Sequence, residues 1–530
     1  MGLPANARMA HDARHEDDPH AAAERRYSPL ALQRSLDPFA DAAAWFEYAM
    51  QGQAPPPVLA VIGLGYGHLL AVLEVVAPQT RVLALEPDPQ IAREVLARRE
   101  WLDWRTTGRL LYLIGPDYAG ASDAARQLPA SRPSDYRVLV HPGLAEDANV
   151  DAVAAARTLK RILSGAKLNA EARRAFAPRY LQNTLANIDR IVDQGDVAAL
   201  TGAADQTPAI LVAAGPSLDA QLEALRELQD RAVIIAVDTA FRPLRAAGIS
   251  PHFVVALDPS EANARHLLGT SPTQGTCLVA EGSVDPRVCR AFDDVFFFQV
   301  SNHEPWPWLS RYGVACGRLS AWGSVLTTAV DLARRLGCDP LVFAGADLAF
   351  TDERPYCRGT VYEEGWRAAS DLGYDLHFTW RSEIEARHPV DTLDLHGRPT
   401  QSTAALEAFR DWVVEQSRRP PRRQFINTTG AGILFGGRVQ QRTLNELKPG
   451  PSLGPIRDRF RALRVRRPEA DIEVLTARVT SELAGWRTND LGRRWAAFTM
   501  LAEPSLGPII DQALARLSAG CAAADSRELA

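Results

Sequence analysis

Glycine-rich turns after apolar runs are the feature of this sequence with the clearest chemical meaning. Gly215, Pro216 and Ser217 lie between the apolar run 209–213 and a stretch with helical spacing. Glycine lets the backbone approach a ligand, proline fixes the turn, and the serine hydroxyl joins the free N–H groups of the helix start, which favour a phosphate. A serine that only caps the helix explains the same pattern equally well.

Two aspartates each close an apolar run in the stretch that follows. Asp238 comes after residues 232–237, and Asp258 comes after residues 253–257. Ligands of doubly wound sheets bind outside the carboxyl ends of the strands, and an acid about twenty residues beyond the glycine turn is placed to bind ribose hydroxyls. The alternative is that each aspartate caps the next helix, which the Pro-Ser-Glu sequence at 259–261 favours for Asp258.

Two later junctions repeat this logic. Asp347 comes just after the apolar run 340–344, so it is expected at a strand end. Gly323 and Ser324 begin a predicted helix, 324–336, and offer a second anion-binding turn. All four junctions are expected at one edge of one parallel sheet, and their convergence predicts a site for a phosphorylated, nucleotide-like ligand.

A separate glycine loop lies nearer the N-terminus, between a predicted strand, 58–62, and a predicted helix, 68–76. A second strand, 81–85, ends at an acid, so the candidate ligand loop comprises Gly63, Gly65, Gly67 and Glu86. It resembles the loop of methyltransferases that bind S-adenosylmethionine, with Glu86 on the ribose. The last glycine of the dinucleotide fingerprint would fall at Leu70, which disfavours NAD. A structural unit without a ligand is the preferred interpretation.

Candidates for a general base are histidines in loops. His303 follows a predicted strand, and His377 and His388 lie in residues 351–400, which are polar, aromatic and without clear periodicity. Such a stretch predicts a functional loop or lid, while a solvated histidine is the commoner case. No metal-ligand spacing, nucleophile elbow or P-loop occurs, so no metal site is predicted.

The alternation of apolar strands with amphipathic helices predicts an α/β protein with a parallel sheet covered on both faces. The expected fold is a doubly wound Rossmann-like central domain, a smaller N-terminal Rossmann-like unit and a helical C-terminal region. From residue 401 onward, mainly helices are expected, apart from the Gly-rich stretch 427–437. The predicted division is a disordered tail 1–25, an N-terminal Rossmann-like domain 26–150, a helical connector 151–205, the central domain 206–440 and the helical C-terminal region 441–530.

Composition narrows the class of protein further. A net charge of -5 in 530 residues gives no reason to expect nucleic-acid binding. The six cysteines form no CxxC pair, which is typical of a reducing compartment. The first residues lack the apolar core of a signal peptide, and no run of roughly eighteen apolar residues occurs. A cytoplasmic protein without a membrane span is therefore expected.

Seven strings of residues together resemble the motility accessory factor (Maf) proteins. They run in order from about Asn183 to Leu447, half of the chain, and they are 214–219 (AGPSLD), 238–240 (DTA), 248–255 (GISPHFVV), 257–259 (LDP), 323–325 (GSV), 345–350 (GADLAF) and 425–432 (FINTTGAG). The resemblance implies a glycosyltransferase with a sialyltransferase-like central domain. Such an enzyme moves a nonulosonic acid of the pseudaminic, legionaminic or sialic acid type from a CMP-sugar to Ser or Thr of flagellin, which supports flagellar assembly and motility.

The resemblance also implies roles for the residues singled out above. The phosphate of the donor would lie at the two turns, which comprise Gly215, Pro216, Ser217, Gly323 and Ser324. Asp238 and Asp258 would contact ribose or cytosine, and Asp347 would serve near the sugar or the acceptor. The CMP-sugar needs no further cofactor, a need for metal is left open, and flagellin is the expected protein partner.

One departure from the family concerns the base, and two other functions stay open. Family members often carry His-Ala-x-Gly after the Asp-Leu-Ala motif, where this chain reads Tyr-Cys-Arg-Gly at 356–359. If that histidine is the base, Tyr356 or His377 replaces it here. The same superfamily contains Mg-dependent hydroxymethylpterin pyrophosphokinases (MptE-like), which tend to carry Asp-Leu-Asp-Gly and His-Gly-Asp where this chain has 256–259 (ALDP) and 281–283 (EGS). A non-catalytic protein of flagellar assembly is the third reading.

Overall fold

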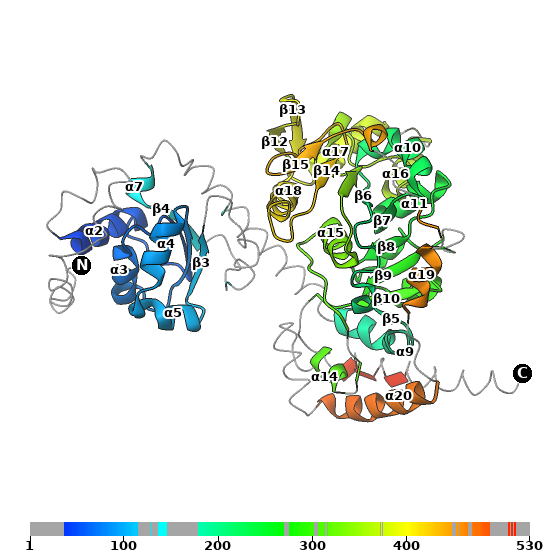
Figure 1. Ribbon diagram of the computed structural model, residues 1–530, viewed down its shortest axis with the longest axis horizontal. Coiled ribbons are helices and arrows are strands. Elements are labelled where there is room, and N and C mark those ends of the chain that lie inside the picture. The colour runs from blue at the N-terminus through cyan, green and yellow to red at the C-terminus, as the bar shows by residue number, and fades with distance from the viewer. Residues whose placement is uncertain are drawn as a thin grey trace, which may run out of the picture. The chain divides into compact units, whose positions relative to one another are not determined.

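The computed structural model divides the chain into two compact units, Met1–Ala170 and Glu171–Ala530 (Figure 1). The residues that it describes are 37–114, 128, 136–145, 159, 179–269, 275–300, 306–311, 313–314, 316–371, 373, 375–447, 452–454, 456–464, 469–487, 507–508, 510–511 and 514–515. The predicted tail 1–25 lies outside them. Among these residues, no helix is both long and apolar enough to cross a membrane.

The first unit contains a parallel sheet of four described strands in the order β3-β2-β1-β4. The strands are β1 (Val58–Ile62), β2 (Arg81–Glu86), β3 (Leu110–Ile114) and β4 (Tyr136–Val140). The helices are α2 (Pro38–Met50), α3 (His68–Val76), α4 (Pro89–Leu96), η3 (Arg99–Trp101), α5 (Leu102–Thr106) and α7 (Pro142–Ala145). The predicted strands 58–62 and 81–85 and the predicted helix 68–76 are confirmed as β1, β2 and α3. Their apolar residues pack into one core.

The second unit is organised around a sheet of nine described strands, all parallel to their neighbours. Its order is β15-β14-β11-β6-β7-β8-β9-β10-β5. The strands are β5 (Gly195–Asp196), β6 (Ala209–Val212), β7 (Val233–Val237), β8 (Phe253–Ala256), β9 (Cys277–Glu281), β10 (Val295–Phe298), β11 (Leu341–Ala344), β14 (Phe425–Asn427) and β15 (Val439–Gln441). The chain steps outward from β6 to β10 and then returns to β11 on the other side of β6.

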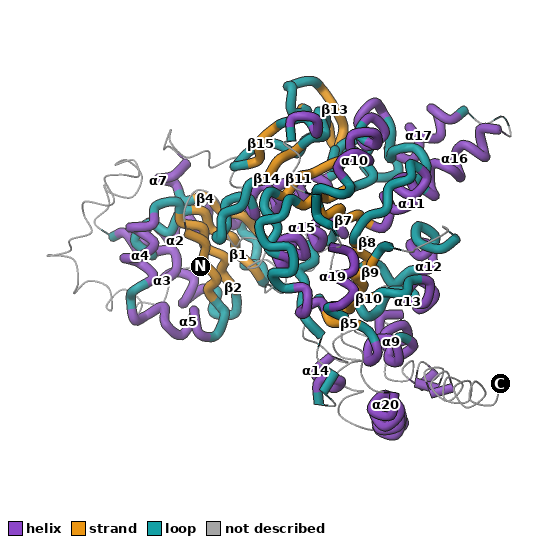
Figure 2. The backbone as a smooth tube through the Cα atoms, turned by 45° about the vertical axis from the view of Figure 1, so that its right-hand side comes forward, coloured by secondary structure: helices purple, strands orange, loops and turns teal. Residues whose placement is uncertain are grey.

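Helices cover both faces of this sheet. Helices α11 and α15 both pack on β7 and β8, and Figures 1 and 2 show them on opposite sides of these strands. The helices of the unit are α9 (Ile188–Asp193), η5 (Val197–Leu200), η6 (Pro216–Ala220), α10 (Leu222–Leu228), α11 (Asp238–Ala246), α12 (Glu261–Ala264), α13 (Pro286–Ala291), α14 (Trp306–Ser310), α15 (Val325–Leu336), η7 (Thr351–Glu353), α16 (Val361–Asp371), α17 (Leu376–Glu385), α18 (Ala404–Gln416), η8 (Leu444–Glu446), α19 (Ile456–Ala462), α20 (Glu469–Ala484) and η9 (Gly485–Arg487). The doubly wound α/β fold predicted from the sequence is thus confirmed.

One prediction for the region after β11 is wrong. Residues 351–400 are not an irregular lid, because they contain α16, α17 and a hairpin of β12 (Val390–Leu393) and β13 (Pro399–Ser402). The described residues after 401 are mainly helical, as predicted, and two short strands, β14 and β15, lie at the ends of the Gly-rich stretch and extend the main sheet. The hairpin is polar and largely exposed, and each of the two sheet strands is only three residues long, so periodicity is weak in all of them.

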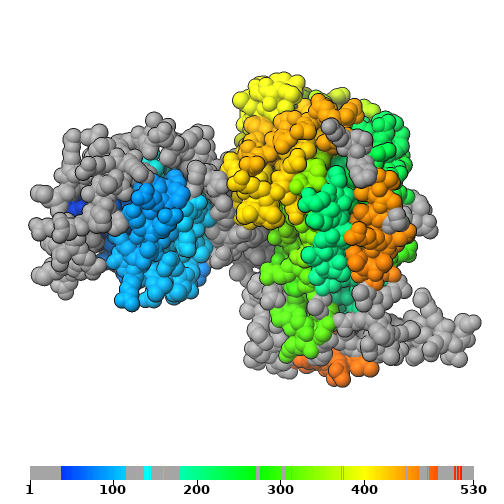
Figure 3. Space-filling model, viewed as in Figure 1, coloured from blue at the N-terminus to red at the C-terminus, as the bar shows by residue number. Residues whose placement is uncertain are grey.

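Helix α19 closes the amino-terminal edge of the sheet, the edge opposite to the predicted site. The Arg457 guanidinium donates to backbone carbonyls just before β8 and β9. Arg461 and Arg464 both pair with Asp294, which precedes β10, at 2.8 Å and 3.0 Å. Figure 3 shows this helix, in orange, on the surface of the unit. The helix therefore neutralises a nearly buried carboxylate and caps strand ends at the same time.

The turn after β11 is held between two other loops. The Ile433 amide donates to the Asp347 carbonyl at 2.9 Å, and the Ser402 hydroxyl donates to the Leu348 carbonyl at 2.7 Å. Gly432 lies against this turn with a positive φ of +76°, and a Cβ there would come within 2.1 Å of the Asp347 carbonyl oxygen. Only glycine therefore fits at this position.

We expect Gly432→Ala to lower the free energy of unfolding of the second unit by about 3 kcal/mol, since it adds a clash with fixed backbone to a left-handed φ. Gly430→Ala is the matched control: its φ is +65°, with nothing within 4 Å of an added Cβ, so a loss of about 1 kcal/mol is expected. Urea unfolding of both variants checks this, and equal losses would contradict it.

Candidate functional site

The candidate site lies at the carboxyl edge of the main sheet. Strands β6 and β11 are neighbours there, and the chain continues from them to opposite ends of the sheet. Such a reversal of strand order leaves a crevice between the two departing loops, where open α/β sheets bind their ligands. The loop after β6 carries Gly215, Pro216 and Ser217, and the loop after β11 carries Asp347.

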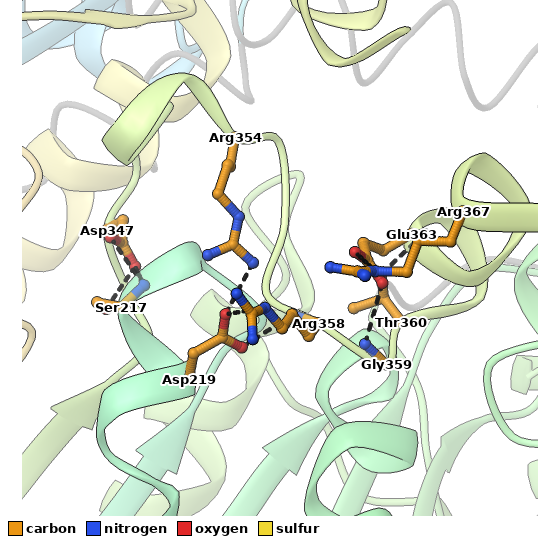
Figure 4. A network of polar contacts seen from close by, with 9 residues as sticks. All are labelled: Ser217, Asp219, Asp347, Arg354, Arg358, Gly359, Thr360, Glu363 and Arg367. Carbon is orange, nitrogen blue, oxygen red and sulfur yellow. Dashed lines mark hydrogen bonds and ion pairs between the residues drawn. The ribbon is translucent and has the colours of Figure 1, made fainter. Parts of the chain in front are cut away.

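These two loops are joined directly. The Ser217 hydroxyl donates to Asp347 Oδ2 at 2.6 Å, and the Ser217 amide lies 3.3 Å from both carboxylate oxygens (Figure 4). A Cβ on Gly215 would lie 2.1 Å from Asp347 Oδ2, so the close approach requires glycine. Burial raises the pKa of Asp347. The anion at this helix start is thus an internal carboxylate, at the place where the sequence predicts a phosphate.

Asp238 and Asp258 lie at the ends of the next two strands. Asp238 is the buried first residue of α11; its carboxylate accepts from Asn263 Nδ2 at 2.7 Å and from the Thr239 amide at 2.7 Å. Burial, and to a smaller degree the charge of Asp258, raise the pKa of Asp238 to about 6. Asp258 is half-buried and accepts from the Ser260 amide at 2.7 Å, but the N-cap of α12 is Ser260, so the expectation that Asp258 caps this helix is wrong.

An aromatic cluster borders these carboxylates; we use this name for Tyr356, Tyr362, Trp366 and His266. Tyr356 stacks on Tyr362 with ring centroids 5.3 Å apart, and Trp366 lies 6.2 Å from Tyr362 at a similar tilt. Burial raises the pKa of Tyr362, and the nearby Tyr356, Asp238 and Asp258 raise it further. The cluster is linked to Asp238 through the segment after α12, since Asn263 binds Asp238 and His266, three residues later, meets the Tyr362 ring.

Arginines hold the segment before α16 against the β6 loop. Arg354 pairs with Asp219 at 2.7 Å, and the Arg358 amide donates to the same carboxylate at 2.9 Å (Figure 4). Farther along, the buried Glu363 accepts from Arg367 and from the Gly359 amide. Arg387 covers the face of Tyr356 with its guanidinium carbon 5.1 Å from the ring centroid. The site is thus lined by cations as well as by carboxylates.

The remaining candidates do not all join this group. His377 is exposed on α17 and faces Trp380, with ring centroids 5.1 Å apart. Ser324 caps α15 by accepting from the Leu326 amide at 3.2 Å, and Gly323 precedes it with a φ of +72°. His388 is exposed, and His303 lies outside the described residues.

Side chains of the first unit itself, Glu86 and His141, lie against its glycine loop. Gly63, Gly65 and Gly67 all have positive φ, as a tight loop after β1 requires. The Glu86 carboxylate is fully buried, and its oxygens accept from the Leu64 amide at 2.7 Å and the Asp88 amide at 3.0 Å. A Cβ on Gly65 would lie 2.8 Å from His141 Nε2. These contacts agree with a structural role for the loop.

Some members of the site were not found from the sequence, namely Asn263, His266, Tyr362, Trp366 and Asp219. Tyr362 and Trp366 are four residues apart in α16, and residues at this spacing lie on the same face of a helix. Their proximity could therefore be predicted from the sequence once α16 is recognised as a helix. Asn263 lies three residues after Ser260, the N-cap of α12. This spacing can also be recognised in the sequence. Within the described residues, no cluster of three or more His, Cys, Asp or Glu side chains is arranged to hold a metal.

Comparisons with known proteins agree with the central motifs. Residues 182–353 match the family model of the 6-hydroxymethylpterin diphosphokinase MptE-like proteins. Two uncharacterized proteins of Treponema pallidum (strain Nichols) are each 30% identical, one over 112 residues and the other over 132. These matches span 21% and 22% of this chain and 52% and 33% of the relatives' lengths.

A solved structure, the Maf glycosyltransferase from Magnetospirillum magneticum AMB-1, aligns over 94% of this chain and 82% of its own. Its sequence identity of 19% and TM-score of 0.48 are too low to support an argument about activity. The range matched by the family model includes Ser217, Asp238, Asp258 and Asp347. It ends before Tyr356 and before α16, which carries Tyr362 and Trp366. Residues 182–353, less than half of the chain, are thus similar to the MptE-like proteins.

Proposed function

We propose that the protein is a glycosyltransferase that moves a nonulosonic acid of the pseudaminic, legionaminic or sialic acid type from a CMP-sugar to Ser or Thr of flagellin. The proposal rests on the Maf-like motifs together with one observation of the site. Asp238, with its partner Asn263, lies beside stacked aromatic rings at the carboxyl edge of the sheet. A hydroxyl-rich nucleoside needs this pairing of polar acceptors and aromatic surface.

The nucleoside half of the donor matches the side of the site formed by β7 and β8. Asp238 and Asp258 supply carboxylate oxygens that accept from ribose hydroxyls or from the cytosine amino group. The half-buried rings of Tyr356, Tyr362 and Trp366 offer a surface against which a base can stack. The carboxylates and the rings come from different segments, Asp238 from the start of α11 and Tyr362 and Trp366 from α16.

The phosphate and the sugar carboxylate of the donor both carry negative charge, so the site has to supply cations or N–H groups. The turn at Ser217 is already taken by Asp347, which repels a second anion at short range. Arg358, which is exposed, and Arg387, which lies over Tyr356, are cations near the same edge. The capped start of α15 at Ser324 adds backbone N–H groups.

Transfer requires the acceptor hydroxyl to attack the anomeric carbon of the sugar while the bond from that carbon to the phosphate oxygen breaks. The hydroxyl proton passes to a base, and CMP leaves with the bonding electrons. Asp347 is a candidate base because burial raises its pKa above that of an exposed carboxyl group. Tyr356 is the second candidate, and its hydroxyl lies 3.4 Å from Arg387 Nη1.

Two other functions compete with this proposal. The matched family is named after a pterin diphosphokinase, and a phosphate would approach the carboxylate of Asp347 more easily through a bound cation. Both points favour a Mg-dependent kinase as the second candidate. A non-catalytic partner in flagellar assembly is the third. The three functions differ in the nucleotide that they bind and in their need for metal.

Calorimetric titration of the full chain with CMP, CDP, ATP and S-adenosylmethionine, each with and without Mg²⁺, separates them. We expect CMP to bind without metal, with a Kd between about 1 µM and 1 mM. Binding of ATP that needs Mg²⁺ would favour the kinase instead. If none of the four ligands binds, the non-catalytic function is favoured. Binding of S-adenosylmethionine would indicate that the glycine loop of the first unit is a ligand site.

We also expect Asp238→Asn to stabilise the protein at neutral pH and to weaken CMP binding. The raised pKa of about 6, against 3.8 for a free aspartate, means that the folded state holds a proton that the unfolded state has lost between about pH 4 and 6. Stability therefore falls as pH rises through this window, by about 3 kcal/mol at most. The variant lacks this loss, since an amide does not ionise and Asn263 can turn its own amide to match.

Urea unfolding at pH 4 and pH 7.5 measures the effect. The variant gains stability over the native chain at pH 7.5 and gains little at pH 4. The exposed Asp371→Asn, which removes a charge at the end of α16, is the control and is expected to change neither value. A constant difference between the two pH values would show that Asp238 is not protonated in the fold.

A further inference from the structure

His266 is a buried histidine whose ring has no polar partner in the described part of the chain. It follows α12, and its side chain is buried, with the residue only 1% exposed. Neither Nδ1 nor Nε2 has a hydrogen-bond partner among the described residues. Buried polar atoms without a partner are rare in folded proteins and call for a specific explanation.

The surroundings of His266 belong to the proposed nucleoside side of the site. Its ring meets Tyr362 edge-on, with centroids 5.0 Å apart and an interplanar angle of 65°. Asn263, one turn earlier, donates to Asp238 at 2.7 Å. The charges that act on the ring are those of Arg242 and Arg265, which lower its pKa, and of Asp258, which raises it.

Burial is the largest cause of the shift and brings the pKa of His266 to about 4. The imidazole is therefore neutral at physiological pH. A neutral imidazole offers one N–H donor and one lone pair. A ligand hydroxyl, which both donates and accepts, is the group that matches this pair of functions in either tautomer.

The main chain on both sides of His266 is held in place by Arg242. Arg242 donates to the carbonyls of Arg265 at 3.1 Å and Leu268 at 2.7 Å, and it pairs with Glu364 of α16 at 3.4 Å. Helices α11 and α16 are thus tied to the segment that carries the histidine. An apolar ring would fill the same space without two unsatisfied nitrogens, so stability alone does not account for a histidine here.

We infer that His266 binds a ribose hydroxyl of the donor nucleotide, next to the carboxylates of Asp238 and Asp258. This inference rests on the proposed function, because it takes CMP as the nucleotide. It makes His266 a binding residue that no motif in the sequence singles out. Tyr362, whose ring packs against the imidazole, holds the histidine toward the ligand.

The test is a cycle of two proteins and two ligands. The native chain and His266→Phe are titrated with CMP and with 2′,3′-dideoxy-CMP, which lacks both ribose hydroxyls. Phenylalanine keeps the edge-on contact with Tyr362 and removes both nitrogens. We expect the substitution to weaken CMP about tenfold, the size of one hydrogen bond between neutral groups, and to leave the affinity for the dideoxy nucleotide unchanged.

Other outcomes of the cycle are equally clear. Equal weakening of both ligands, or no weakening of either, overturns the role of His266 while leaving the proposed function intact. Failure of the native chain to bind CMP overturns both. The melting temperature of His266→Phe is expected to equal or exceed that of the native chain, because two buried unsatisfied atoms are removed; a large fall would indicate a structural role. His396→Phe, at the exposed turn of the β12–β13 hairpin, is the matched control.

Discussion

The hydrogen bond from Ser217 to Asp347 joins the two loops that leave the sheet in opposite directions. The carboxylate of Asp347 leaves no room for a side chain at Gly215, and the main chain of Asp347 leaves none at Gly432. Gln221 adds a second tie across the same crevice, since its side chain accepts from the Gly345 amide at 2.8 Å and donates to the Thr428 carbonyl. Three loops far apart in the sequence are thereby locked at one point, and every other group of the site is placed relative to it.

The sequence was sufficient for the strands and for the edge at which the site forms. Strands β6, β7, β8, β10 and β11 are short and wholly apolar, because both faces of a parallel sheet are buried, and such runs can be recognised in the sequence. Since the carboxyl ends of parallel strands lie at one edge, the polar residue after each run marks that edge. Ser217, Asp238, Asp258 and Asp347 were found in this way.

What the sequence could not predict depends on contacts between distant segments. Asp347 and Ser217 were expected to serve the same ligand, but whether they touch each other is decided by the pairing of β6 with β11. The aromatic cluster joins residues from the segment before α16, from α16 itself and from the end of α12. Helices α16 and α17 are polar over most of their surface, so their periodicity is too weak to reveal where these rings lie.

The position of α19 has a consequence for the order in which the second unit acquires its structure. Asp294 and the carbonyls before β8 and β9 have their arginine partners on α19 and just after it, more than a hundred residues later in the chain. On a ribosome, the strands emerge first, and the amino-terminal edge stays open until residues 457–464 have been synthesised. Long-range closure of this kind slows folding. Translation therefore leaves an interval in which Asp294 and these carbonyls lack the arginine partners that they have in the finished fold.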